Sequence, residues 1–192
     1  MNASREAKLV QYAELVRRWN PRINLVARTT IEDIETRHIR DSLQLNDLVS
    51  PSAGTWMDIG SGGGLPGLVL AICRPQTSFR LVDSDSRKVV FLQTVIRELS
   101  LPNCTAQAAR IENLSPAKAL TLSARALAPL ERLMPYLARH LAPEGTAWLM
   151  KGRNWQTELA PTQESWNFEL KIHPSKTDED AAILQIWNVK HV

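Results

Sequence analysis

The sequence predicts an α/β protein built on a doubly wound, mostly parallel sheet that is preceded by a helical extension. From residue 55 onward, short apolar runs alternate with longer segments whose apolar residues recur at helical spacing. The first of these runs leads directly into a glycine-rich stretch, MDIGSGGGLPG at residues 57–67. In doubly wound sheets such a stretch forms the turn between the first strand and its helix, and ligands bind beside it.

The first fifty residues are expected to be helical. Residues 4–19 carry apolar side chains at helical spacing, and Pro21 is expected to lie just beyond the end of that helix. Thr29 and Glu32 form a capping-box pattern, which predicts a second helix over roughly 30–48. These two helices make up the predicted extension.

Pro51 and Gly54 mark a boundary between a helical extension, 1–50, and a sheet domain, 51–192, which we expect to pack as one compact unit. Seven strands are expected, at 55–59, 79–83, 104–109, 120–124, 146–151, 168–173 and 182–189. Helices are expected over 65–73, 86–100 and 129–141. Only polar turn residues separate the last two strands, so these strands should pair antiparallel at the end of the sheet.

Composition indicates a single globular protein of the cytoplasm. The chain has 192 residues, 44% of them hydrophobic, and no apolar run long enough to cross a membrane. Charged side chains interrupt the first sixteen residues, so we expect no signal peptide. Cys73 and Cys104 lie far apart and without metal-ligand spacing, which favours reduced thiols and no bound metal.

The glycine-rich stretch fits two binding patterns. Gly62, Gly64 and Gly67 match G-x-G-x-x-G, the dinucleotide fingerprint of many oxidoreductases. Gly60, Gly62 and Gly64 match G-x-G-x-G preceded by an acid, which resembles motif I of the class I, Rossmann-like methyltransferases that use S-adenosylmethionine. A glycine pattern alone is a weak guide to the cofactor.

Two aspartates bear on this choice. Asp58 stands at the edge of the turn, where a carboxylate would repel a pyrophosphate but would suit a sulfonium and an ammonium group, either by holding them or by organising the loop. Asp83 ends the second predicted strand, about 20 residues after the glycines, where an acid accepts hydrogen bonds from ribose hydroxyls. Asp58 therefore favours the methyl donor, whereas Asp83 fits either adenosyl cofactor.

Several stretches resemble one family in particular. They are WNPRINL (19–25), RHIRDSL (37–43), DIGSGGGLPG (58–67), LVDSDSRKVVFL (81–92), ARIENL (109–114), SARALAPL (123–130) and LMKG (149–152). The chain thereby resembles the bacterial 16S ribosomal RNA guanine-N7 methyltransferases, also called glucose-inhibited division protein B. RHIRDSL and SARALAPL are the most specific of these stretches, because methyltransferases in general lack them.

The resemblance implies S-adenosyl-L-methionine as cofactor, the 16S rRNA of the small ribosomal subunit as partner, and a set of site residues. For cofactor binding these are Asp58, Gly60, Gly62, Gly64, Leu65, Asp83, Ile111, Glu112 and Arg125. Ile111 and Glu112 should reach the adenine, and Arg125 should stand where the methyl donor meets the base. The resemblance places Arg110 beside the cofactor loop and Lys151 at the end of the fifth strand, and with Arg125 these form the expected catalytic set.

The implied reaction needs no general base. Guanine N7 already carries a lone pair, so the enzyme must align donor and acceptor and exclude water. An arginine on N7 would block attack and oppose the developing positive charge, so Arg125 is expected to contact O6, a phosphate or the cofactor carboxylate, or else to form a structural ion pair. His38 and Asp41 are expected to tie the N-terminal helices to the sheet edge.

An RNA partner also fits the type of basic residue present. Of 23 basic residues, 16 are arginine, which pairs with phosphates better than lysine, although the net charge is only +3. Arg17, Arg18, Arg22 and Arg28 are candidate phosphate contacts. Because A-form RNA hides N7 in a narrow groove, the target should lie in a loop or an opened region. Near the C-terminus the family usually has an arginine-containing turn, whereas this chain reads TDEDAAILQIW (177–187), and we expect a monomer.

Three other functions stay open at this point. The first is a methyltransferase of the same fold that acts on another RNA, a protein or a small molecule. The second is a dinucleotide-dependent oxidoreductase, for which the sequence offers no evident acid or base beside a hydride. The third is a non-catalytic RNA-binding protein, which the complete set of cofactor residues disfavours.

Overall fold

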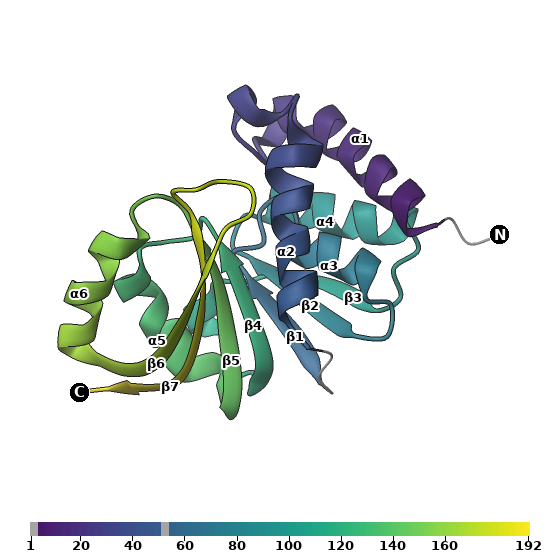
Figure 1. Cartoon of the computed structure of the whole chain (residues 1–192). Coiled ribbons are helices and arrows are strands. Elements are labelled where there is room, and N and C mark those ends of the chain that lie inside the picture. The colour runs from purple at the N-terminus through teal and green to yellow at the C-terminus, as the bar shows by residue number, and fades with distance from the viewer. Residues whose placement is uncertain (1–3, 51–53) are drawn as a thin grey trace.

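A computed structural model describes residues 4–50 and 54–192, so the predicted boundary residue Pro51 lies outside the described residues. Seven strands form one sheet in the order β3-β2-β1-β4-β5-β7-β6 (Figure 1). The strands are β1 (Thr55–Ile59), β2 (Ser78–Asp83), β3 (Cys104–Ala108), β4 (Ala119–Arg125), β5 (Leu141–Lys151), β6 (Trp166–Pro174) and β7 (Ala182–His191). All neighbours are parallel except β7, which is antiparallel to β5 and β6, so the predicted fold class is confirmed.

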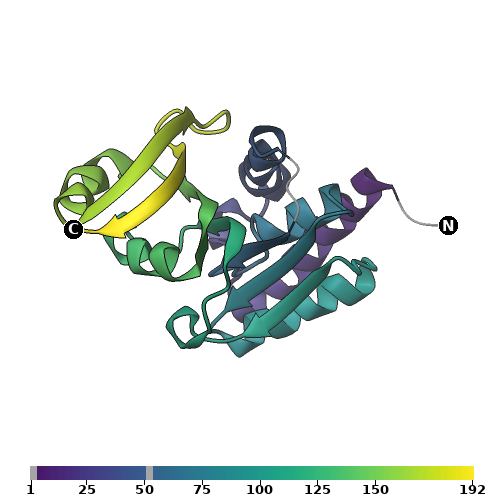
Figure 2. The same cartoon turned by 90° about the horizontal axis from the view of Figure 1, so that it is seen from below.

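Helices cover both faces of the sheet. They are α1 (Arg5–Ile23), α2 (Arg40–Leu48), α3 (Gly67–Cys73), α4 (Ser86–Glu98), α5 (Leu130–His140) and α6 (Trp155–Ser165). One hydrophobic core lies between the sheet and α1 to α4, and a second lies between the sheet and α5 and α6. Figure 2 shows the β6–β7 pair at one end of the twisted sheet and β3 at the other.

The sheet has a topological switch between β1 and β4. The chain passes from β1 to β2 and β3 on one side and then returns to β4 on the other side, and ligands bind at the carboxyl ends of strands at such a point. In register, Asp58 of β1 lies between Leu81 of β2 and Ser123 of β4. The glycine turn, Asp83 and Arg125 therefore come together at one edge of the sheet.

Helix α1 extends further than predicted and contains Pro21 in its last turn. A proline there removes one helical hydrogen bond without breaking the helix, because few turns follow it. Asn24 then adopts a left-handed conformation, and its N–H donates to the carbonyl of Asn20 at 3.0 Å. The side chain of Asn20 accepts from the N–H groups of Leu25 and Val26 at 2.7 and 2.9 Å, which fixes the chain as it leaves the helix.

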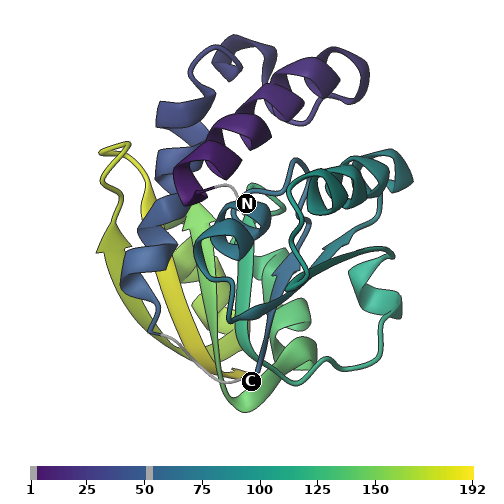
Figure 3. The same ribbon diagram turned by 90° about the vertical axis from the view of Figure 1, so that its right-hand side faces the viewer.

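The predicted capping box at Thr29 and Glu32 is wrong. Residues 28–30 form one turn of 3-10 helix with no side-chain cap, and a π-helix over Ile34–Ile39 then continues directly into α2. The side chain of Asn20 fixes the backbone of Leu25 and Val26 as the chain leaves α1. The residues that follow therefore enter a 3-10 turn and not the first turn of a capped α-helix. Figure 3 shows α1 and these helical turns lying above the sheet.

Two further differences lie in the second half of the chain. Helix α6 was not predicted, because it contains Pro161 and buries little more than Thr162, so it has no apolar stripe to recognise. Strand β5 begins at Leu141 rather than at residue 146, and its pairing with β4 shifts register between Ala119 and Thr121. Pro143 and Gly145 lie within this irregular first part of the strand.

Candidate active site

A cavity of about 670 Å³ opens at the carboxyl ends of β1, β2 and β4. Four segments build its walls: the glycine turn, the end of β2, the turn after β3 and the residues after β4. Residues 25–27 from the N-terminal segment close it. Of the residues expected to bind the cofactor, those that line this cavity are Gly60, Gly62, Leu65, Asp83, Ile111, Glu112 and Arg125. Arg110 lines it as well, and Lys151 does not.

The glycine turn has a backbone that other residues rarely adopt. Gly60, Gly62 and Gly64 have φ angles of +63°, +52° and +91°. A Cβ atom on Gly60 would lie 2.4 Å from a methyl carbon of Leu127, and one on Gly64 would lie 2.3 Å from a methyl carbon of Leu68. The positive φ angles favour glycine at all three positions, and close packing adds to this at Gly60 and Gly64, so backbone atoms form this part of the cavity wall.

Asp58 is fully buried beneath this turn and is not among the residues that line the cavity. Its Oδ1 accepts a 2.5 Å hydrogen bond from Ser123 Oγ, which in turn accepts from Trp56 Nε1 at 2.9 Å. Burial raises the pKa of the Asp58 carboxyl to about 6, although the hydrogen bond from Ser123 acts in the opposite direction. Of the two roles considered for this acid, organising the loop matches its position, and direct contact with a ligand does not.

Asp83 lines the cavity and holds the turn from the side. Its Oδ2 accepts from the Gly62 N–H at 2.7 Å, and its Oδ1 accepts from the Asp85 N–H at 2.9 Å. Each carboxylate oxygen keeps a second lone pair for a ligand. In a dinucleotide site the amides of the glycine turn bind phosphate. Here the Gly62 amide is already bonded to a carboxylate, so this cavity suits an adenosyl ligand that carries no phosphate.

The turn after β3 forms another wall of the cavity and is held by α5. Ile111, Glu112 and Asn113 make one turn of 3-10 helix. His140, at the end of α5, donates from Nε2 to the Ile111 carbonyl at 3.0 Å. Burial lowers the pKa of this histidine, which keeps the ring neutral. His140 could not be predicted from the sequence, because no local motif links the end of α5 to a turn 29 residues earlier.

Arg125, at the end of β4, is held by two residues of the RHIRDSL stretch. Its Nη1 donates to Asp41 Oδ2 at 2.8 Å, and its Nη2 donates to His38 Nδ1. The other ring nitrogen of His38 lies 2.8 Å from the hydroxyl of Thr30. Burial and the charge of Arg125 lower the pKa of His38 to about 4, so the ring accepts from the guanidinium as a neutral group. The expected link between the N-terminal helices and the sheet edge is thus made through Arg125 itself.

Lys151 lies at the end of β5 and does not line the cavity described above. Its Nζ contacts Glu158 Oε2 at 2.6 Å and the Ala128 carbonyl at 3.0 Å. The same Glu158 oxygen accepts from the Leu130 N–H at 2.7 Å, which ties α6 to the start of α5. Lys151 is therefore engaged in a structural ion pair in this conformation.

The N-terminal helix takes part in the site, which the sequence did not reveal. The buried Tyr12 hydroxyl donates to the Gly63 carbonyl at 2.7 Å, and Leu25 packs against the same glycine. Tyr12 was recognisable only as one apolar position of α1. A contact across 51 residues leaves no signal in a local pattern.

The described residues contain no group of three or more His, Cys, Asp or Glu side chains that could hold a metal ion. None of the described helices is both long enough and apolar enough to span a membrane.

Solved structures of other proteins share this fold at low sequence identity. A SAM-dependent methyltransferase from Aquifex aeolicus has a TM-score of 0.61 at 11% identity, with 81% of this chain and 91% of that chain covered. A mutant of MtNAS in complex with S-adenosylmethionine has a TM-score of 0.63 at 13% identity, with 95% and 75% covered. At these identities the likeness shows the fold alone.

Sequence comparison gives the family. A family model described as rRNA small subunit methyltransferase G matches residues 5–183. A relative from Paracoccus denitrificans, named Ribosomal RNA small subunit methyltransferase G, is 55% identical over 192 residues and 100% of both chains. A relative of the same name from Cereibacter sphaeroides is 52% identical over 100% of this chain and 95% of its own. The chain therefore belongs to the rRNA small subunit methyltransferase G family.

Proposed function

We propose that this chain transfers a methyl group from S-adenosyl-L-methionine to N7 of a guanine in the 16S rRNA of the small ribosomal subunit. The observation that carries the proposal is the hydrogen bond between Asp83 and the Gly62 amide, which makes the cavity unsuited to phosphate while leaving it shaped for an adenosyl group. The 55% identity to a Ribosomal RNA small subunit methyltransferase G over the whole chain supports rRNA as the acceptor.

The cavity residues divide the binding of S-adenosylmethionine among them. Asp83 accepts from the ribose hydroxyls with its remaining lone pairs, and the side chain of Ile111 packs on the adenine. Glu112 and nearby main-chain groups meet the adenine edge, while Gly60 and Leu65 face the methionine part. Asp58 acts from below the turn, where its side chain bonds to Ser123 of β4 and its carbonyl accepts from Ser61 Oγ of the turn.

For this reaction the side chains need only align the methyl donor with the acceptor base. When bound, S-adenosylmethionine supplies a methyl group on a sulfonium sulfur, and its transfer to N7 leaves a neutral thioether and a positively charged base. N7 has no proton to lose, so no general base is needed. Asp41 and His38 hold Arg125 at the cavity wall, which keeps its charge from pressing on N7 and leaves its remaining N–H groups for O6, a phosphate or a carboxylate. Holding the donor and the acceptor in a fixed orientation raises the rate of methyl transfer.

The RNA partner is expected to meet the side of the N-terminal helices. Arg18, Arg22 and Arg28 are exposed and make no ion pair within the described part of the chain. Arg110 is exposed and lines the cavity, which supports the proposal that it contacts RNA or orders the loop after β3. We propose that the protein acts as a monomer on small subunits in the cytoplasm.

The test uses purified protein, methyl-labelled S-adenosylmethionine, and small ribosomal subunits from cells that lack the endogenous activity. Label on a guanine N7 of 16S RNA is the expected result. If the protein binds S-adenosylmethionine but labels neither subunits nor naked 16S RNA, the acceptor is a different RNA, a protein or a small molecule. If it binds no S-adenosylmethionine, the proposed function is wrong.

A further inference from the structure

A second cavity of about 220 Å³ lies beside the first one. The two cavities share Arg125 and Ala126, so they meet at the end of β4. The floor of the second cavity comes from the ends of β4 and β5, and one wall comes from the loop between β6 and β7, residues 175–181. Arg37 and Asp41 complete the lining from the N-terminal side.

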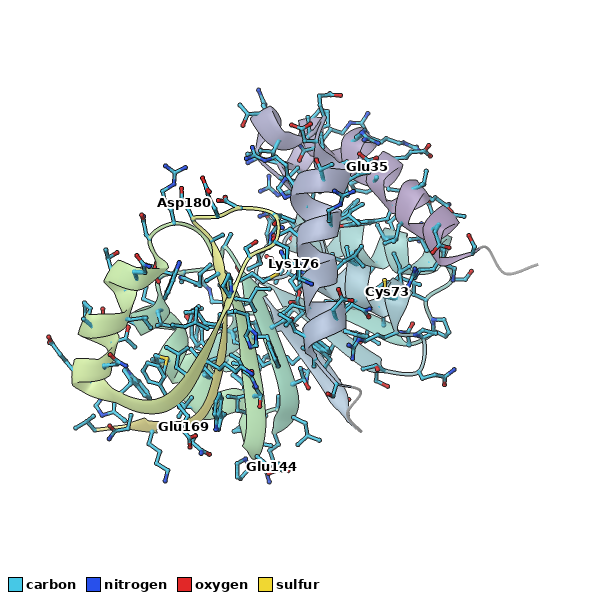
Figure 4. The ribbon with its side chains drawn as sticks, viewed as in Figure 1. Glu35, Cys73, Glu144, Glu169, Lys176 and Asp180 are labelled. Carbon is cyan, nitrogen blue, oxygen red and sulfur yellow. The ribbon has the colours of Figure 1, made fainter. Side chains whose placement is uncertain are left out.

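The β6–β7 loop is fixed on α2 by a network of hydrogen bonds. The buried side chain of Gln44 donates to the hydroxyls of Ser175 and Thr177, both at 3.2 Å, and accepts from the Lys176 N–H at 2.6 Å. The Thr177 hydroxyl also donates to Asp41 Oδ1 at 2.8 Å. Figure 4 shows Lys176 over α2 and Asp180 further from it on the same loop. The wall of the second cavity is therefore held in place rather than free.

Asp178 is the carboxylate of this cavity that remains available. The carboxylate of Asp41 already accepts from Arg125, Gln44 and Thr177. Asp178 lines the cavity and makes no ion pair with any described residue. Its Oδ1 accepts from the Asp180 N–H at 3.1 Å, which orients the group within the loop.

We propose that the second cavity receives the acceptor guanine and that Asp178 recognises its Watson–Crick edge; this inference rests on the proposed function. Guanine presents two parallel donors there, N1–H and N2–H, which a carboxylate accepts together. N7 lies on the opposite side of the ring system. A guanine held at the loop by Asp178 thus directs N7 toward the junction of the two cavities at the end of β4, beside Ala126.

The same arrangement selects guanine over adenine. Adenine carries an unprotonated N1 acceptor at the position of the guanine N1–H, and a carboxylate facing it leaves two acceptors opposed. A site built to accept hydrogen bonds from a substrate rejects analogues that lack the donors, because its own polar group is then left unpaired. Asp178, one of the acids that stand where the family usually has an arginine-containing turn, thereby acquires a role in reading the base.

The test compares Asp178→Asn with Asp180→Asn in the full-length protein. In the Asp178→Asn variant the side-chain amide oxygen can still accept from the Asp180 N–H, so the loop keeps its conformation. Both variants remove one negative charge from the same loop, but of the two positions only 178 lines the cavity. Each protein is assayed on small subunits whose 16S RNA carries either guanine or inosine at the mapped target, since inosine lacks the N2 amino group and retains N7.

Wild-type protein and Asp180→Asn should prefer guanine over inosine by about tenfold in kcat/KM, the value of one hydrogen bond to a charged group. Asp178→Asn should lose about 10- to 100-fold on guanine, the usual cost of a lost bidentate base contact, and its preference should fall toward one. Its affinity for S-adenosylmethionine should match that of the wild type, which separates base recognition from loss of folding.

An unchanged guanine preference in Asp178→Asn, or an equal loss in both variants, would overturn the assignment of Asp178. If wild-type protein puts no label on any guanine, the proposed function fails and this inference fails with it. Labelling of guanine with no effect of Asp178→Asn rejects only the base-reading role.

Discussion

Arg125 is the residue on which the two cavities converge. Its guanidinium is mostly buried, with 15% of the side chain exposed, and it is bonded to Asp41 and His38. The structural ion pair expected for Arg125 is present and holds the cation at the cavity wall, whereas its contact with O6, a phosphate or the cofactor carboxylate stays a prediction. Because the expected role of Arg125 is to align the base, its loss should misplace the acceptor, and a misplacement of about 1 Å can cost about 100-fold in rate.

Replacing Arg125 with alanine should therefore reduce kcat by about 100-fold. Stability should fall by only about 1–2 kcal/mol, because Asp41 keeps its bonds from Gln44 and Thr177. Methyl-transfer kinetics and urea unfolding measure the two effects separately. Arg97→Ala, an exposed site on α4, is the control and should change neither. Wild-type turnover by folded Arg125→Ala would show that the ion pair is structural only.

Asp58 gives the stability of the protein a pH dependence of a defined sign. Its pKa of about 6 in the folded state lies above the ordinary value of 3.8, so between pH 4 and 6 the folded chain binds more protons than the unfolded one. Stability from this group is therefore present at low pH and is lost as the pH rises through 6. His38 contributes the opposite trend, because its pKa is lowered.

Asp58→Asn should isolate the first contribution. The free energy of unfolding of the wild type minus that of the variant should decrease by up to about 3 kcal/mol as the pH rises from 4 to above 6, and should then stay level. Urea titrations across this range provide the measurement. A difference that does not change with pH would show that Asp58 ionises with an ordinary pKa.

At the scale of elements, α1 is a support for the cofactor turn. The Tyr12 hydroxyl bonds to the Gly63 carbonyl in a buried position, and burial raises the pKa of that hydroxyl. The turn is thus held from three directions: by Tyr12 of α1, by Asp83 at the end of β2, and by the Asp58 carbonyl underneath it, which accepts from Ser61 Oγ. Removing one of these hydrogen bonds should make the backbone of the glycine turn, which contacts the ligand, more mobile.

Tyr12→Phe should lower stability by about 1–2 kcal/mol, because the buried Gly63 carbonyl loses its partner. Affinity for S-adenosylmethionine should fall several-fold, as measured by calorimetry. Val10→Ala, an exposed change on the same helix, should affect neither quantity. If Tyr12→Phe is less stable but binds the cofactor normally, α1 supports the fold and not the site.

The strands and the helices of the sheet domain could be predicted from the sequence because each has its own apolar period and its own breaking residues. Elements without such a period could not, as α6 and the π-helix before α2 show. The same division holds for the site. Gly60 and Asp83 sit at strand ends, where local patterns are readable, and Ile111 was expected only from the family resemblance. Tyr12 and His140 reach their partners only through tertiary packing.

At the scale of the whole molecule, RNA binding depends on where unpaired positive charge lies. Arg17 forms an ion pair with Glu35, with both carboxylate oxygens at 2.8 Å from Nη2. Arg28 is exposed, and no ion pair to it is present among the described residues. The two arginines belong to the same extension but should contribute differently to a salt-dependent interaction.

Arg28→Gln should weaken binding to 16S RNA and should reduce the slope of log Kd against log salt by about 0.7–0.9, the share of one phosphate contact. Arg17→Gln is the matched control and should reduce the slope less. Filter binding over a range of salt concentrations tests this. Equal slopes for wild type and Arg28→Gln would place the RNA on another face.

The bond between Asp83 and the Gly62 amide also decides which metabolites can compete for the site. ATP and the nicotinamide dinucleotides share the adenosine of the methyl donor and are common in cells. The turn offers them no free Gly62 amide for a phosphate and sets a carboxylate in its place. The enzyme should therefore respond to the supply of methyl groups and remain indifferent to the energy and redox state of the cell.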